Sequence, residues 1–256
     1  MLSYQHMYHA GGLADVHKHA VLAVMLEKLS AKPKSLTYVE THAGRGLYDL
    51  GAPEAGKTGE AAEGILHLLK QGDLPADHAY ARLITACRAT HGPHAYPGSP
   101  WIARQALRDN DRIHLCELHP REVVALRETM GRRAQIQQKD GYQDVLRRAP
   151  FDPRRGFVLI DPSYEVKSEY RDAADFVLAL HRKWPVATIL LWYPVLEKAL
   201  HKDMVDRVND AGLPKTWSQE VLFDPTRRSR ALGSGLLSVN TPFGIEAALD
   251  HVATLF

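Results

Sequence analysis

The chain has 256 residues, which is enough for one large α/β domain or for a domain that carries an inserted module. Its formal net charge is only +2, so any contact with nucleic acid has to come from a local basic patch, and a bulk positive field is excluded. The two cysteines, Cys87 and Cys116, have neither metal-binding nor disulfide spacing, and no secretory signal or long apolar run is recognisable, which predicts a cytoplasmic protein.

The first hundred residues predict an arm, a helix, a strand and a helical insertion. Residues 1–12 are rich in His, Tyr and Gly and are expected to form an ordered arm, and residues 15–29 have the apolar spacing of a helix that ends before Pro33. Residues 1–30 thus form an N-terminal arm and helix, and "SLTYVETHAGRG" then predicts a strand that runs into a glycine turn. Residues 51–97 hold two predicted helices, "TGEAAEGILHLLKQG" and "ADHAYARLITACRATHG", and we expect them to form a small inserted subdomain.

The rest of the chain alternates between strands and helices. "PGSPWIARQAL" predicts a helix start, with Ser99 as N-cap and Pro100 at the first helical position. Strands are predicted in "RIHLCELHP", "RAQIQQ", "GFVLIDPSYE", "ATILLWYPVL" and "SGLLSVNTPFG", and helices in "REVVALRETM", "DGYQDVLRR" and "ADFVLALHRKW". This alternation predicts a doubly wound, mainly parallel sheet built from residues 1–50 and 98–256.

Polar residues stand at the ends of these strands, where ligands bind in such sheets. The positions are Glu40, His42, Gly44 and Gly46 after the first strand, Glu117 after the second, Asp140 after the third and Asp161 after the fourth. The G-x-G turn is typical either of a ligand-binding loop or of a plain strand-to-helix turn. Glu117 suits a ribose diol or a solvated strand end, and Asp140–Gly141 suits a ligand contact or a helix cap.

The stretch Asp161–Tyr164, "DPSY", carries the sharpest chemical signal. An exocyclic amine on an aromatic base is a poor nucleophile because its lone pair is delocalised. A carboxylate and a backbone carbonyl that accept both of its N–H bonds would expose the lone pair, and an aromatic side chain would hold the base in plane. Pro162 stiffens the turn that presents its carbonyl. The stretch therefore predicts methyl transfer to an amine, with an ordinary Asp-Pro turn as the alternative.

One basic segment differs from the others. "PTRRSRALGSG" is basic, glycine-bearing and loop-like, whereas the remaining basic clusters suit solvated helix ends. Together with Lys18 we expect this loop to face RNA phosphates, through Arg227, Arg228 and Arg230.

Fourteen histidines raise the possibility of a metal site. Metal ligation needs several converging ligands, and no Cys or carboxylate partner stands at a recognised spacing, so no metal is expected. His17 is expected at the surface. Trp192 and Tyr193 follow a buried strand and suit either an active-site wall or core packing.

Several motifs taken together resemble the RlmJ family over roughly residues 1–245, in the family's order. They are "MLSYQHMYHAGGLADVHKHAVL", "THAGRGLYDLG", "YPGSPWIARQALR", "ELHP", "KDGYQ", "LIDPSYE" and "LWYPV". The resemblance implies a Rossmann-like class I methyltransferase that transfers a methyl group from S-adenosylmethionine to N6 of an adenine in 23S ribosomal RNA. We expect a monomer, and we expect RNA free of ribosomal proteins to be preferred because the target base must be reached.

The resemblance also implies roles for individual residues. Asp161 and Pro162 would accept from the target amine, and Tyr164 would stack on the adenine. The N-terminal motif would close over the cofactor and help to position the target, through Tyr4, His6 and Lys18. The cofactor would be held by His19, His42, Ser99, Glu117, Asp140, Gly141 and Asp161. For His19 the alternative is a hydrogen bond to Asp15 on the same helix.

The sequence departs from the family's motif at Ser163, where the motif has a second proline. The Pro162 carbonyl remains, but the φ restraint at residue 163 is lost, so we expect a looser loop and a lower rate. Two alternatives stay open. One is the same amine methylation on DNA adenine or a protein amide, and the other is a catalytically weak RNA-binding protein that still binds S-adenosylmethionine.

Overall fold

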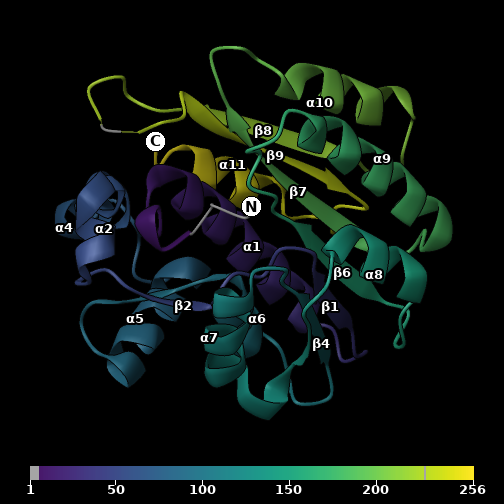
Figure 1. Ribbon diagram of the computed structural model, residues 1–256, viewed down its shortest axis with the longest axis horizontal. Helices are drawn as coiled ribbons and strands as arrows, with labels where there is room; N and C mark the ends of the chain where they lie inside the picture. Colours follow the sequence, from purple (N-terminus) through teal and green to yellow (C-terminus); the bar gives the residue numbers. More distant parts are fainter. Residues whose placement is uncertain (1–5, 228) are drawn as a thin grey trace.

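The computed structural model describes residues 6–227 and 229–256, and within them seven strands form one sheet (Figure 1). Its strand order is β5-β4-β1-β6-β7-β9-β8, where the first five are parallel and β9 runs antiparallel to β7 and β8. The strands are β1 (Thr37–Glu40), β4 (Arg112–Cys116), β5 (Gln135–Gln137), β6 (Gly156–Ile160), β7 (Thr188–Val195), β8 (Trp217–Leu222) and β9 (Gly233–Val239). Numbered along the chain within this sheet, the order is 3-2-1-4-5-7-6, which confirms the predicted doubly wound, Rossmann-like class I methyltransferase fold.

Helices cover both faces of the sheet, because each central strand buries side chains on both sides. Tyr38 and Leu159 pack in the layer that contains α1 (Leu13–Ser30), whereas Val39 and Val158 pack in the opposite layer. The first layer also holds α6 (Ser99–Ala106), α7 (Pro120–Met130) and α11 (Glu246–Ala253), and the second holds α8 (Gly141–Arg148), α9 (Ser168–Lys183) and α10 (His201–Asp210) (Figure 1). A short 3₁₀ turn, η2 (Gly131–Arg133), follows α7.

Helix α1 lies inside the molecule and not on its surface. It is preceded by the 3₁₀ turn η1 (His6–Tyr8), and its residues from Val16 to Leu26 are all buried, which is typical of a helix without a solvent face. The prediction that His17 lies at the surface is therefore wrong. His17 is 0% exposed, because β8, β9 and α11 cover that side of the helix.

Residues 51–97, predicted as an inserted subdomain, begin and end beside each other. Strand β2 (Leu47–Asp49) pairs antiparallel with β3 (Ala95–Pro97), a pairing that the sequence analysis missed. Between them lie α2 (Pro53–Thr58), α3 (Glu60–Glu63), α4 (Ile65–Gln71) and α5 (Ala79–His91). The division into a main domain and an insertion stays a prediction.

The first predicted helix of this stretch is broken at Gly64, between α3 and α4. The break brings the backbone of Gly64 against Gly11, and the N–H of Ile65 donates to the Gly11 carbonyl at 2.9 Å. A Cβ atom at Gly64 would lie 2.2 Å from the Gly11 oxygen. The sequence pattern predicted one continuous helix because it contains no information about this distant contact.

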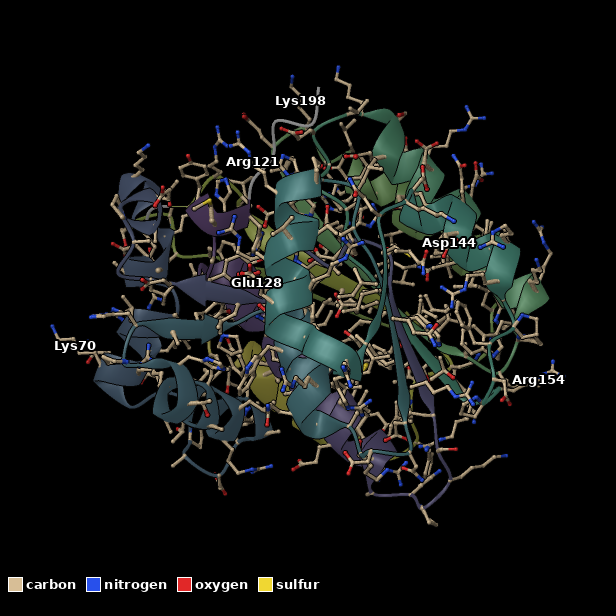
Figure 2. All side chains as sticks on the ribbon, turned by 60° about the horizontal axis from the view of Figure 1, so that its bottom comes forward. Lys70, Arg121, Glu128, Asp144, Arg154 and Lys198 are labelled. Carbon is tan, nitrogen blue, oxygen red and sulfur yellow. The ribbon has the colours of Figure 1, made fainter. Side chains whose placement is uncertain are left out.

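Charged side chains point outward over much of the surface. Figure 2 shows Lys70, Arg154 and Lys198 extending from different sides of the molecule. Among the described residues, no helix is long and apolar enough to cross a membrane.

Candidate active site

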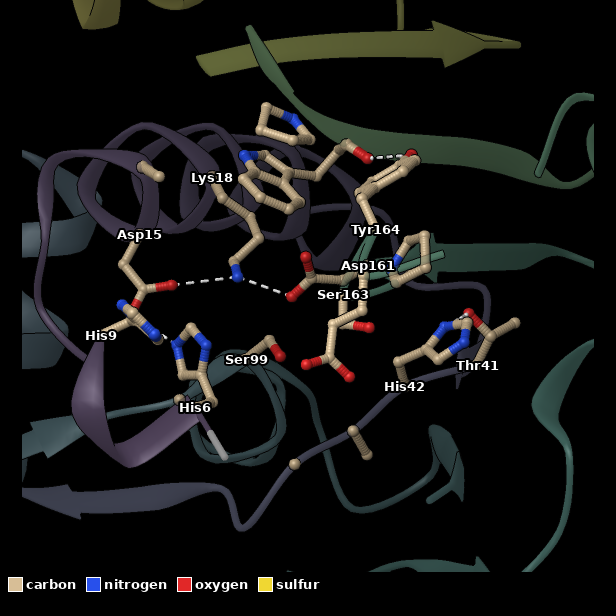
Figure 3. Close-up of a pocket in the computed structure, with 18 of the residues that line it drawn as sticks. His6, His9, Asp15, Lys18, Thr41, His42, Ser99, Asp161, Ser163 and Tyr164 are labelled. Atoms are coloured by element: carbon tan, nitrogen blue, oxygen red, sulfur yellow. Dashed lines mark hydrogen bonds and ion pairs between the residues drawn. The ribbon is translucent and has the colours of Figure 1, made fainter. Parts of the chain in front are cut away.

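A pocket of about 560 Å³ opens beyond the carboxyl ends of β1, β4 and β6 (Figure 3). Its size falls within the roughly 300–1,000 Å³ that is usual for small-molecule sites. It is lined by nearly all the predicted site residues, namely His6, Lys18, His19, His42, Ser99, Glu117, Asp140, Gly141, Asp161, Pro162, Tyr164 and Arg230. Tyr4 and Arg228, which were also predicted, lie outside the described residues. The ends of the parallel strands bring His42, Glu117, Asp140 and Asp161 together, as the topology requires.

Lys18 and Asp161 form the centre of the pocket. Lys18 Nζ lies 2.6 Å from Asp161 Oδ2 and 3.0 Å from Asp15 Oδ1, as the dashed lines of Figure 3 show. Burial alone would lower the pKa of Lys18, but the charges of Asp15 and Asp161 outweigh it and raise that pKa above its usual value. Lys18 is only 3% exposed, so the structure places it inside the pocket and corrects the expectation that it faces RNA phosphates.

Asp15 holds the N-terminal turn against the pocket. Its Oδ2 accepts from His6 Nε2 at 2.8 Å and from the N–H of Gly11 at 3.0 Å. Although burial opposes ionisation, the charges of His6 and Lys18 keep the pKa of Asp15 well below its ordinary value. The sequence analysis did not assign Asp15 to the site, although its i,i+3 spacing to Lys18 was a signal that could have suggested the pair.

The alternative proposed for His19 is wrong. Its Nδ1 lies 2.9 Å from the hydroxyl of Tyr96 and makes no hydrogen bond to Asp15. Burial lowers the pKa of His19 to about 3, so the imidazole is neutral where it lines the pocket.

Ser99 lines the pocket one position inside its helix. Gly98 is the N-cap of α6, so the prediction of Ser99 as N-cap is wrong by one residue. The Ser99 hydroxyl instead donates to Glu40 Oε2 at 2.9 Å, and the Tyr38 hydroxyl donates to Glu40 Oε1 at 2.6 Å. Glu40 is 0% exposed, and burial raises its pKa to about 8.

Glu117 follows β4 and is held by backbone donors. Its Oε2 accepts from the N–H of Gly44 at 2.7 Å, and its Oε1 accepts from the N–H of His119 at 2.7 Å. The glycine turn after β1 therefore fixes the carboxylate that the sequence analysis assigned to a ribose diol. Burial raises the pKa of Glu117 above its ordinary value.

Asp140 and Gly141 start α8 at the pocket edge. Asp140 is the N-cap and accepts from the N–H of Gln143 at 3.0 Å, so the capping alternative holds for this residue even though it lines the pocket. A Cβ atom at Gly141 would lie 2.0 Å from the carbonyl oxygen of Thr41. The two backbone segments are therefore so close that only glycine fits at position 141. Beside them, burial lowers the pKa of His42 to about 4, and its Nδ1 lies 2.8 Å from Thr41 Oγ1.

Tyr164 adopts an uncommon backbone conformation at the pocket wall. Its φ is +54°, in the left-handed region that non-glycine residues rarely occupy. Its hydroxyl donates to the carbonyl of Trp192 at 2.8 Å, and its ring centroid lies 4.4 Å from that of Tyr170. Trp192 lines the pocket and so forms part of the active-site wall. Tyr193 is fully buried in the opposite layer and belongs to the core.

The basic loop after β8 reaches the pocket rim. Arg230 is exposed and lines the pocket, whereas Arg227 is half-buried and donates to the carbonyl of Glu63 at 3.3 Å. The loop thus lies between the active site and the segment 51–97.

Comparison with known proteins decides the family. A family model described as "Ribosomal RNA large subunit methyltransferase D, RlmJ" matches residues 33–256. The chain belongs to the RlmJ family. It is 38% identical to Ribosomal RNA large subunit methyltransferase J of Escherichia coli, over 98% of this chain and 91% of the relative. The protein of the same name from Haemophilus influenzae is 36% identical over 98% of this chain and 92% of its own length.

A solved structure supports the same fold over nearly the whole length. The crystal structure of protein LPL1258 from Legionella pneumophila superposes with a TM-score of 0.86 at 32% identity, covering 96% of this chain and 92% of that chain. Because the similarity covers 96% of this chain, it includes most of the helical segment 51–97 as well as the sheet.

Members of a methyltransferase family such as RlmJ use a methyl donor, and the pocket residues fit S-adenosylmethionine. That molecule carries a sulfonium and an ammonium group, and the pocket wall is rich in carboxylates, including Glu117, Asp140 and Asp161. Glu117 is fixed by two backbone donors and can still accept from hydroxyl groups through its remaining lone pairs. Among the described residues, no group of three or more His, Cys, Asp or Glu side chains could hold a metal ion.

Proposed function

We propose that this protein transfers a methyl group from S-adenosylmethionine to N6 of a specific adenine in 23S ribosomal RNA. Family membership supports methylation of large-subunit ribosomal RNA. The observation that carries the choice of an amine is the position of Asp161 and Pro162, which follow β6 directly and line the pocket beside Tyr164.

In this proposal the pocket residues divide between cofactor and base. Glu117 would bind the ribose hydroxyls, Asp140 and Gly141 would contact the adenine end of S-adenosylmethionine, and the methionine end would lie near Asp161. His19, His42 and Ser99 would complete the wall, and both histidines are neutral donors or acceptors at physiological pH. The bound cofactor would supply an electrophilic methyl group.

Asp161 would act on the amine that receives this group. One oxygen, Oδ2, already accepts from Lys18 at 2.6 Å, so the other oxygen and the Pro162 carbonyl would accept the two N–H bonds of the target amine. Accepting both bonds aligns the nitrogen lone pair, and the negative charge of Asp161 stabilises the positive charge that develops on the nitrogen. The amine loses a proton once it becomes cationic, so no strong base has to act before the attack.

Three further residues of the pocket would have supporting roles. Tyr164 would stack on the flipped adenine, with its ring held from behind by Tyr170. Lys18 would fix the orientation of the Asp161 carboxylate, and His6 would act with Asp15 to hold the N-terminal turn over the pocket. RNA contact would come from the loop that holds Arg227 and Arg230.

The test is transfer of labelled methyl groups to protein-free 23S ribosomal RNA from cells that lack the enzyme. After digestion to nucleosides, label should appear in N6-methyladenosine. Asp161→Ala should reduce the rate by about 10²-fold or more, because the charge-stabilising acceptor is lost. Asp109→Ala, at an exposed turn at the other end of the sheet, is the matched control and should transfer at the wild-type rate.

Several outcomes would overturn the proposal or parts of it. Label in DNA or in a protein amide, and none in ribosomal RNA, would show that ribosomal RNA is not the substrate. Tight cofactor binding without transfer to any substrate would support the alternative of a binding protein impaired by Ser163. Faster transfer to assembled large subunits than to free RNA would contradict the expected preference for RNA without ribosomal proteins. Sedimentation of the active protein would test the expected monomer.

A further inference from the structure

A buried hydrogen-bond chain runs from the pocket wall into the core. Trp192 Nε1 lies 2.9 Å from Ser234 Oγ, and Ser234 Oγ lies 2.9 Å from His17 Nδ1. His17 Nε2 in turn lies 3.1 Å from Gln219 Oε1. We propose that this chain fixes the indole of Trp192 and that Trp192 is a positioning residue for methyl transfer, acting through Lys18 and Tyr164. The inference rests on the proposed function.

The donor and acceptor groups in this hydrogen-bond chain fix the position of each proton. Gln219 Nε2 donates to the carbonyl of Leu249 at 3.1 Å, so Oε1 of Gln219 faces His17 and accepts. His17 therefore carries its proton on Nε2, and its Nδ1 accepts from the Ser234 hydroxyl. The Ser234 oxygen accepts from the indole N–H of Trp192, which can only donate. Burial lowers the pKa of His17 to about 4, so this arrangement persists at neutral pH.

Trp192 contacts both groups that the reaction needs beside Asp161. The Lys18 ammonium lies 5.3 Å from the centroid of the Trp192 ring, within the range of a cation–π contact. The backbone carbonyl of Trp192 accepts from the Tyr164 hydroxyl at 2.8 Å. Tyr164 has a positive φ, and such a conformation persists only when its surroundings hold it. The indole itself lies beside Tyr164, with the two ring centroids 6.0 Å apart. A rotated indole would thus shift the Lys18 ammonium relative to Asp161 and change the packing against the Tyr164 ring.

Core packing alone does not account for the polar residues of this hydrogen-bond chain. A buried polar side chain costs free energy unless it is hydrogen-bonded, and an apolar residue would fill position 17 without that cost. His17 and Ser234 are both 0% exposed, yet both carry the polar groups that connect to Trp192. The next residue, Tyr193, packs in the opposite layer, and its hydroxyl donates to Glu220 and not to the hydrogen-bond chain.

Strand β9 supplies a matched control. Ser234 and Ser238 are both 0% exposed, and since they are four residues apart on one strand they face the same side of the sheet. Among the described residues, Ser238 Oγ has no hydrogen-bond partner. Removing the hydroxyl at 238 deletes an equal group from the same face of the same strand and breaks no hydrogen bond to Trp192.

The experiment compares Ser234→Ala, Ser238→Ala and Trp192→Phe in the full-length protein. With protein-free 23S ribosomal RNA, Ser234→Ala and Trp192→Phe should each lower kcat about tenfold, while KM for RNA and for S-adenosylmethionine stays within about twofold. Ser238→Ala should match the wild type. In ¹⁵N spectra, the indole N–H resonance that is missing in Trp192→Phe should move in Ser234→Ala and stay in place in Ser238→Ala.

The double variant tests the coupling directly. In the Trp192→Phe background, Ser234→Ala should cause little further loss of kcat, because the bond it removes is already absent. The inference is overturned if Ser234→Ala has the kcat of Ser238→Ala, or if the two losses multiply in the double variant. If Ser234→Ala does not fold, an unchanged kcat in Trp192→Phe overturns it instead. A wild-type protein that transfers no methyl group overturns the proposed function, whereas the indole spectra still report whether the chain exists.

Discussion

Two buried carboxylates, one in the first turn of α1 and one at the end of β1, differ in charge because their neighbours differ. Asp15 lies between Lys18 and His6, and their charges outweigh the cost of burial, so it stays ionised. Glu40 accepts from the hydroxyls of Tyr38 and Ser99, and burial raises its pKa to about 8. At neutral pH the carboxyl of Asp15 is therefore charged, whereas the raised pKa of Glu40, which is buried behind the pocket wall, favours its protonated form.

The raised pKa of Glu40 predicts that stability falls as pH rises from about 5 to 8. Between its ordinary value of 4.5 and about 8, Glu40 keeps a proton in the folded state that it loses in the unfolded state. The free energy of unfolding should therefore fall as pH rises through this window, by up to about 1.4 kcal/mol per pH unit. Glu40→Gln, which resembles the protonated acid, should remove this decline. Urea unfolding of both proteins from pH 5 to 9 measures the difference.

The difference between the two proteins isolates Glu40 from other titrating groups. Burial lowers the pKa values of His17 and His42 to about 4, so those residues reduce stability as pH falls below their ordinary value of 6.5. Their contribution has the opposite sign and is the same in wild type and Glu40→Gln. Parallel pH profiles for the two proteins would show that Glu40 is ionised in the folded state and would contradict the prediction.

At the scale of elements, the sequence predicts correctly those helices and strands whose positions depend on neighbouring residues. The buried strand before Asp161 and the cap at Asp140 are encoded by neighbouring residues, so β6 and α8 and their polar ends were predicted correctly. Most of the residues predicted to hold the cofactor line one pocket because parallel strands end at the same edge, whereas His19 and Ser99 are brought there by α1 and α6. The pairing of β2 with β3, the break at Gly64 and the inward position of Lys18 depend on contacts between distant segments, which periodicity does not reveal.

The contact between Gly64 and Gly11 gives a prediction about how the helical segment docks. Gly64→Ala would place a Cβ atom 2.2 Å from the Gly11 oxygen, and since both groups are backbone the elements must separate. We expect a loss of about 1–3 kcal/mol in the free energy of unfolding and weaker binding of S-adenosylmethionine, because His6 and His9 on the adjoining turn line the pocket. Thermal unfolding and calorimetric titration measure the two effects.

Gly56→Ala is the control for this substitution. Gly56 is exposed within α2, and a Cβ atom there would have no neighbour within 4 Å. Alanine favours a helix over glycine by up to about 1 kcal/mol, so this variant should be slightly more stable and should bind the cofactor normally. Equal behaviour of the two variants would mean that the segment docks without the close approach of Gly64 to Gly11.

At the scale of the whole molecule, three segments that are distant in sequence meet at the pocket rim. They are the N-terminal turn with His6 and His9, the segment 51–97 through Glu60, and the loop after β8 through Ser229–Ala231. The pocket wall is rich in carboxylates, whereas the exposed Arg230 brings a positive charge to its edge. With a net charge of only +2, RNA affinity has to come from such local positions.

Arg230→Ala should therefore weaken RNA binding in a salt-dependent way. If Arg230 neutralises one phosphate, its loss should reduce the slope of log affinity against log salt by about one, with little effect on the binding of S-adenosylmethionine. Arg112→Ala removes an arginine that is 57% exposed at the amino end of β4, on the edge of the sheet opposite the pocket, and should leave the slope unchanged. Filter-binding titrations with protein-free 23S ribosomal RNA at several salt concentrations measure both slopes. Equal slopes for wild type and Arg230→Ala would move the RNA-binding surface away from this loop, whereas a reduced slope in Arg112→Ala would show that RNA also contacts the opposite edge of the sheet.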